Sequence, residues 1–95
     1  MTSRLNEEQI GAGLKMATGW EQRGNAIVRD YRFPGFSEAI AFVNRVARLA
    51  ESADHHPDIL IRYDKVSLTL STHSSGGVTQ KDFDLARTID AGESA

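Results

Sequence analysis

Apolar and polar positions along the chain recur with the periods of helices and strands, and they predict seven elements. Three stretches repeat apolar residues every three or four positions, as amphipathic helices do. Between them lie segments with the two-residue alternation that is typical of half-buried strands. In chain order we expect a helix capped by Asn6 and stopped by Gly19, strands at residues 20–23 and 26–33, a helix from Ser37 to Ala53, a hairpin at residues 59–70 and a helix from Thr79.

The first helix has a clear start signal. The side chain of Asn6 can accept a hydrogen bond from an open backbone amide, and Gln9 stands three positions further on, which is the spacing of a capping box. Leu5 before the cap and Ile10 after it are placed as a hydrophobic staple. We therefore expect this helix to be fixed at its amino end by local contacts.

The second hairpin has the most regular alternation. Apolar side chains occupy every second position on both sides of Asp64 and Lys65. A two-residue turn at those positions pairs Tyr63 with Val66 and puts all the apolar side chains on one face. The other pairs in this register are Ile61 with Leu68 and Ile59 with Leu70, and its extension sets His56 opposite His73.

These elements predict a single domain over residues 1–95, of the α+β class: a four-stranded antiparallel sheet with helices packed on one face, in the order α-β-β-α-β-β-α. A chain of this length buries only about 60–65% of the surface that its unfolded form exposes, so its own core is marginal. We expect copies of the chain to associate with one another.

Charge and composition exclude several classes of function. The formal net charge is −2 and the basic residues are scattered, which disfavours binding to nucleic acid. No apolar run reaches the length of a membrane span, and the first ten residues have no apolar segment typical of a signal peptide. The chain has no cysteine, so neither disulfides nor thiolate chemistry is expected. The simplest interpretation is a cytoplasmic protein.

The candidate chemistry rests on three histidines. His55 and His56 are adjacent, and the hairpin brings His73 toward them. Three interpretations are open: solvated polar side chains, a zinc site with three imidazoles and a water, or acid–base catalysis. Neighbouring side chains of an extended segment point to opposite faces, which disfavours the zinc site. Imidazole titrates near neutral pH, so one ring can accept a proton while another donates one.

Three further features each have a structural and a functional interpretation. Asp82 follows Thr79 at capping-box spacing and is expected to cap the last helix, although it could also orient a histidine or contact a substrate. Trp20 is expected in the core, the alternative being a stacking wall for a flat ring. Residues 74–77 are rich in serine and glycine but lack a phosphate-loop pattern, so we expect a simple connection there.

At these residues the chain resembles the pterin-4a-carbinolamine dehydratases, also known as the dimerisation cofactor of a homeodomain transcription factor. The resemblance rests on a long motif and covers residues 5–89. Glu51 is followed after three residues by His-His-Pro at 55–57, after five more by Tyr63, after nine more by His73 and after eight more by Asp82. Ile59 stands where many animal members have tryptophan, so the resemblance is to bacterial-type relatives.

The resemblance implies an enzyme that dehydrates 4a-hydroxy-tetrahydropterin to quinonoid dihydropterin. It implies no metal or organic cofactor, assembly into homodimers or homotetramers, and a functional link to an aromatic amino acid hydroxylase. On this chain the implied catalytic set is His55, His56, His73 and Asp82, and the implied substrate-binding set is the three histidines with Trp20.

Our mechanistic hypothesis divides the acid and base roles between His55 and His73. His56 would mainly bind the pterin, and Asp82 would orient a histidine or the substrate. The main alternative function is a non-catalytic dimerisation or coactivator-binding module on the same fold.

Overall fold

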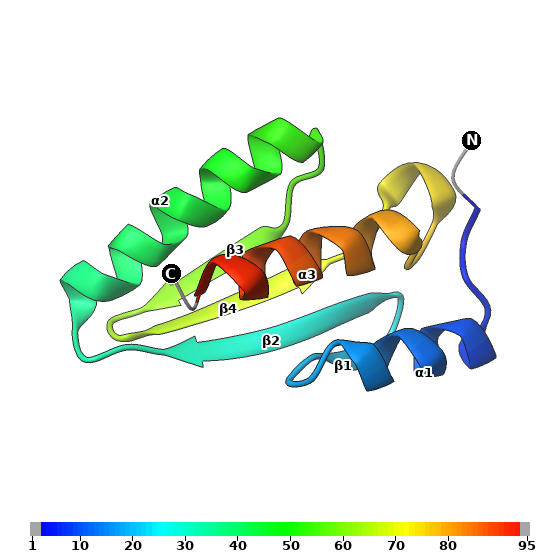
Figure 1. Ribbon diagram of the computed structural model, residues 1–95, viewed down its shortest axis with the longest axis horizontal. Coiled ribbons are helices and arrows are strands. Elements are labelled where there is room, and N and C mark those ends of the chain that lie inside the picture. Colours follow the sequence, from blue (N-terminus) through cyan, green and yellow to red (C-terminus); the bar gives the residue numbers. More distant parts are fainter. Residues whose placement is uncertain (1–2, 94–95) are drawn as a thin grey trace.

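The computed structural model describes residues 3–93, so the ends of the predicted 1–95 domain, at 1–2 and 94–95, lie outside the described part. The order α-β-β-α-β-β-α is confirmed, with one short 3₁₀ helix added before the last α-helix (Figure 1). The elements are α1 (Glu7–Met16), β1 (Glu21–Arg23), β2 (Ala26–Arg32), α2 (Phe36–Ala53), β3 (Asp58–Arg62), β4 (Lys65–Leu70), η1 (His73–Ser75) and α3 (Gln80–Glu93).

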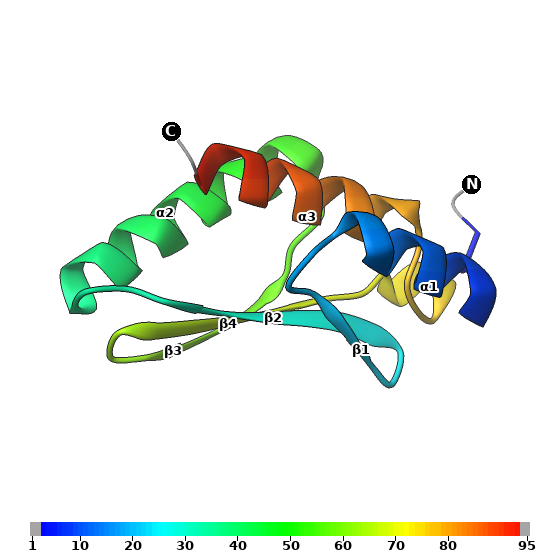
Figure 2. The ribbon, with the colours of Figure 1, turned by 60° about the horizontal axis from the view of Figure 1, so that its bottom comes forward.

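The four strands form one antiparallel sheet in the order β1-β2-β4-β3. All three α-helices lie on the same side of this sheet (Figure 2). The class α+β and the packing of helices on one face are therefore confirmed. The inward side chains of the two central strands are inaccessible to solvent, among them Ile27, Val66, Leu68 and Leu70.

The capping box of the first helix is confirmed. Asn6 Oδ1 accepts the Gln9 backbone N–H at 2.8 Å, and Gln9 Oε1 accepts the Asn6 N–H at the same distance. The helix ends at Met16, three residues before the stop expected at Gly19. Gly19 belongs instead to the turn that leads into β1, where its φ of 97° suits glycine.

The register predicted for the second hairpin is wrong by two residues. The structure pairs Arg62 with Lys65 and Ile61 with Val66, so the turn consists of Tyr63 and Asp64. Tyr63 adopts a left-handed conformation with φ of 56°, and the carbonyl of Asp64 accepts the Phe33 N–H at 2.8 Å. Because this tertiary contact and the left-handed turn set the register, Tyr63 leaves the core face and is 69% exposed.

The shift of two residues keeps the same side chains on the helix face, because side chains alternate with a period of two. It removes the ladder pairing of His56 with His73, however. β3 begins at Asp58 and β4 ends at Leu70, so both histidines lie beyond the ends of the hairpin strands.

Candidate active site

The three histidines line one pocket of about 340 Å³. His55 and His56 lie in the link between α2 and β3, and His73 opens the 3₁₀ helix that follows β4. The walls are completed by residues on both sides of this junction, namely Asp54, Ser71, Thr72, Ser74 and Lys81. The histidines therefore meet at the ends of the strands without being paired within the sheet.

His55 is held by a buried carboxylate. Its Nε2 lies 2.5 Å from Oδ1 of Asp82, and the side-chain exposures are 11% for His55 and 0% for Asp82. A ring nitrogen that faces a carboxylate carries a proton, because the carboxylate can only accept. Nδ1 of His55 is then the ring atom that remains for proton transfer, and the orientation of the imidazole is fixed.

Asp82 also caps the last helix. Its Oδ2 accepts the backbone N–H of Thr79 at 2.8 Å and the hydroxyl of Thr72 at 3.0 Å. The Thr79 hydroxyl in turn accepts the Lys81 N–H at 3.2 Å. Both contacts considered from the sequence, to the helix end and to a histidine, are thus made by a single carboxylate.

His56 and His73 are more open to solvent. Nε2 of His56 lies 2.5 Å from Oε2 of Glu51, with side-chain exposures of 56% and 77%. Among residues 3–93, no side-chain hydrogen bond is made by His73, whose ring belongs to the pocket wall. One histidine is thus fixed by a buried group, one by an exposed group, and one is available to a ligand.

Asp54 is a pocket residue that sequence reasoning missed. It ends α2 in the left-handed conformation, with φ of 51° and ψ of 44°, and its carboxylate makes no hydrogen bond within the described part of the chain. Glycine is the usual residue there, and a carboxylate is unfavourable beside the negative end of the helix dipole. An acidic residue immediately after the apolar stripe of a helix is the signal that could have identified it.

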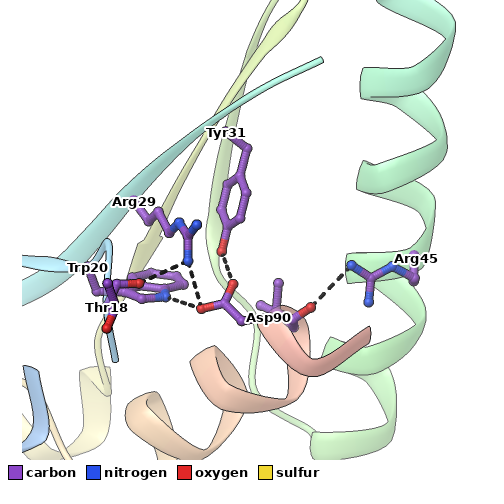
Figure 3. Close-up of polar contacts among 7 residues, drawn as sticks. Thr18, Trp20, Arg29, Tyr31, Arg45 and Asp90 are labelled. Atoms are coloured by element: carbon purple, nitrogen blue, oxygen red, sulfur yellow. Dashed lines mark hydrogen bonds and ion pairs between the residues drawn. The ribbon is translucent and has the colours of Figure 1, made fainter. Parts of the chain in front are cut away.

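Trp20 lies away from the pocket walls, in a second polar cluster (Figure 3). Its Nε1 donates to Oδ2 of Asp90 at 2.8 Å, Arg29 donates to the same oxygen at 3.0 Å, and the Tyr31 hydroxyl donates to Oδ1 at 2.5 Å. Trp20 is 5% exposed and belongs to the hydrophobic core. Trp20 therefore lies in the core, which is the structural role expected from the sequence. The structure does not bring its indole ring together with the histidines.

Within residues 3–93, no group of three or more histidine or acidic side chains is arranged to hold a metal ion. His55 and His56 instead point to different carboxylates. The same part of the chain has no helix long and apolar enough to cross a bilayer.

The fold and the pocket define a single-domain α+β protein with three histidines and a buried aspartate at one end of its sheet. The family model for pterin 4 alpha carbinolamine dehydratase matches residues 3–92. The chain therefore belongs to the pterin-4-alpha-carbinolamine dehydratase family, whose enzymes are hydro-lyases.

Similar proteins agree with this assignment. A protein of Thermomicrobium roseum, provisionally named pterin-4-alpha-carbinolamine dehydratase, is 54% identical over 92% of this chain and 94% of its own length. A protein of Roseiflexus sp. with the same provisional name is 54% identical over 95% of this chain and 97% of its own.

Solved structures are similar as well. The crystal structure of a transcriptional coactivator/pterin dehydratase from Brucella melitensis superposes with a TM-score of 0.90 at 38% identity, over 94% of this chain and 97% of that one. A pterin dehydratase-like RuBisCO assembly factor of the alpha-carboxysome shares the fold, with a TM-score of 0.66 at 23% identity over 78% and 88% of the two chains.

Proposed function

We propose that this chain dehydrates 4a-hydroxy-tetrahydropterin to quinonoid dihydropterin and water by histidine acid–base catalysis. The observation that carries the proposal is the convergence of three histidines on one pocket, with His55 fixed by the buried Asp82. A base removes the N5 proton, the C4a–O bond breaks as the C4a–N5 double bond forms, and an acid protonates the departing hydroxyl. The atoms balance with one proton taken up and one released.

His55 and His73 divide these two roles. The imidazole rings of His55 and His73 are not hydrogen-bonded to each other, and both residues line the same pocket. A ligand bound between them can therefore exchange a proton with each ring. Asp82 is a positioning residue: it orients His55 through Nε2 and takes no part in the bond changes.

The more exposed residues of the pocket bind the pterin substrate. His56 offers a ring that Glu51 holds through Nε2. The carboxylate of Asp54 supplies acceptors for the amino group and the N3–H of a pterin ring, and both of these groups are donors. A flat, donor-rich heterocycle is thus the class of ligand that the pocket suits.

The cellular setting is part of the same proposal. The substrate arises when an aromatic amino acid hydroxylase uses a tetrahydropterin, so the reaction supports tetrahydropterin recycling in the cytoplasm. The proposed mechanism requires no metal or organic cofactor, since both proton transfers are carried by side chains. A homodimer or homotetramer is the proposed assembly.

The test uses 4a-hydroxy-tetrahydropterin generated by a phenylalanine hydroxylase, followed by its ultraviolet decay with EDTA-treated protein. The wild type should exceed the spontaneous rate, and His55→Ala or His73→Ala should each lose about 10²–10⁴-fold in kcat. Lys15→Ala, on the exposed face of α1, is the control.

Near-native turnover in either histidine variant would show that the division of roles is wrong. Wild-type decay at the spontaneous rate would favour the alternative, a non-catalytic dimerisation or coactivator-binding module.

A further inference from the structure

A second pocket of about 340 Å³ adjoins the histidine pocket. Its walls come from residues 49–53 at the end of α2 and residues 81–88 of α3, and we name it the α2–α3 groove. His55 and Lys81 line both the groove and the histidine pocket. Each of the two has the volume of a small-molecule site, for which the range begins at about 300 Å³. The acid–base chemistry of the histidines leaves the groove without a role.

The α2–α3 groove has apolar walls on two helices. Leu49 of α2 packs against the hydrophobic core, and Leu85 of α3 is 2% exposed. Ala53, the last residue of α2, adds a third apolar side chain. An apolar group of a ligand is stabilised between such walls, because the contact removes apolar surface of both partners from water.

The polar part of the groove carries a cation without a partner. Lys81, Asp84 and Thr88 share one face of α3, since they stand three and four residues apart. Oδ1 of Asp84 accepts a hydrogen bond from Gln80 at 3.0 Å and lies 4.0 Å from Nη2 of Arg87, so the charge of Asp84 is balanced. Among residues 3–93, the ammonium of Lys81 makes no ion pair or hydrogen bond. The groove therefore favours a ligand with an anionic group that can pair with Lys81.

The proposed binding of the pterin brings one end of its ring system toward the groove. Asp54, which lines only the histidine pocket, is the proposed acceptor for the amino group at C2 and for the N3–H. C6 lies at the opposite end of the ring system, next to N5, the atom that exchanges a proton with a histidine. A substituent at C6 can then leave the histidine pocket past His55 and Lys81, where the groove begins.

We propose that the α2–α3 groove binds the C6 substituent of the pterin substrate, and that this substituent is an apolar ring followed by a carboxylate. The inference rests on the proposed function, since the histidine pocket has to hold the pterin ring. The ring of the substituent packs against Leu49 and Leu85, and its carboxylate pairs with Lys81. A short aliphatic substituent would leave most of the groove empty, so the groove selects among reduced pterins by the group at C6.

Two stable oxidised pterins test the groove by calorimetry, without reference to catalysis. Pteroylglutamate carries an aminobenzoyl ring and carboxylates at C6, whereas 6-methylpterin carries a methyl group. The wild type should bind pteroylglutamate about tenfold or more tightly than 6-methylpterin, because burial of the ring and the charge-assisted contact both add to its affinity.

Two variants remove the two sources of this preference. Lys81→Gln removes the cation, and Ser52→Trp fills the groove from α2, at a position that does not line the histidine pocket. Each should reduce the ratio of the two dissociation constants about threefold or more. Lys15→Gln removes the same charge from the exposed face of α1, and this matched control should keep the wild-type ratio.

The outcomes separate this inference from the dehydratase proposal. Equal affinity of the wild type for the two pterins, or a preference that survives in both groove variants, would overturn the groove assignment and leave the dehydratase standing. Absence of binding of either pterin would overturn both. A wild type with the expected preference, whose pterin decay assay shows only the spontaneous rate, would keep the groove and overturn the catalytic proposal alone.

Discussion

Nε2 of His55 lies 2.5 Å from Oδ1 of Asp82, a carboxylate with no solvent exposure. The same carboxylate accepts the first amide of the α3 cap and the hydroxyl of Thr72. A buried anion with three donors is rigidly placed, and each donor depends on it. The orientation of the histidine is therefore coupled to the start of the last helix.

The first prediction concerns Asp82→Asn. An amide nitrogen cannot accept a hydrogen bond, so one of the three donors loses its acceptor. We expect the free energy of unfolding to fall by about 1–3 kcal/mol and kcat to fall about tenfold or more. Urea denaturation and the pterin decay assay measure the two effects. Asp84→Asn, two residues further along the chain and on the exposed face of α3, is the control, and equal behaviour of the two variants would contradict the coupling.

A second prediction concerns the cluster around Asp90. Asp90→Ala leaves the Trp20 indole and the Tyr31 hydroxyl without this acceptor, and both residues are 5% exposed. Loss of a hydrogen-bond acceptor is costly for buried donors, so we expect a loss of about 1–3 kcal/mol in the free energy of unfolding. Thermal and urea unfolding are the measurements.

Because Asp90 is not part of the pocket wall, KM should stay near wild type below the melting temperature. An altered KM in a fully folded variant would show that the cluster belongs to the substrate site after all.

The periodic patterns predicted the fold because burial acts on them directly. The stripe of α2 and the alternation of β4 place apolar side chains in one core, with Val46 and Leu68 both fully buried. The register of the β3–β4 hairpin could not be predicted from the pattern, because it depends on the left-handed conformation of Tyr63 and on the hydrogen bond from the Phe33 N–H to the Asp64 carbonyl. Alternation constrains the face of a strand and leaves shifts of two residues free.

The candidate site was predictable only in part, for a similar reason. The family motif identifies His55, His73 and Asp82 as site residues, and the fold places all three at one end of the sheet. Asp54 gave only the weaker signal of an acidic residue after the apolar stripe of a helix, because its role depends on a backbone conformation. Asp90 gave none, because its role depends on distant donors. Arg29 did interrupt the apolar pattern of its strand, and its partner Asp90 is 61 residues away.

A third prediction compares two glycines of α1. A Cβ at Gly11 meets nothing within 4 Å, whereas a Cβ at Gly13 comes within 2.6 Å of the Phe83 ring. Gly11→Ala should therefore raise the free energy of unfolding by about 0.5–1 kcal/mol, through helix propensity. Gly13→Ala should lower it by about 1–3 kcal/mol, because the buried Phe83 has to move. Urea denaturation of the pair measures both, and a shift of the same sign in both variants would contradict the packing of α1 on α3.

The fourth prediction separates stability from binding at Asp54. Asp54→Gly relieves a left-handed conformation with φ of 51° and removes a negative charge from the end of α2. The free energy of unfolding should rise by about 1 kcal/mol. The same change removes the proposed acceptor for the pterin, so KM should rise about tenfold or more, as expected for loss of a charge-assisted hydrogen bond.

Asp54→Asn distinguishes the two causes, because asparagine tolerates the left-handed conformation and lacks the charge. It should raise KM as much as Asp54→Gly does, with a smaller gain in stability. A stabilised glycine variant with an unchanged KM would show that Asp54 only terminates the helix, and the donors of the pterin would then need another acceptor in the pocket.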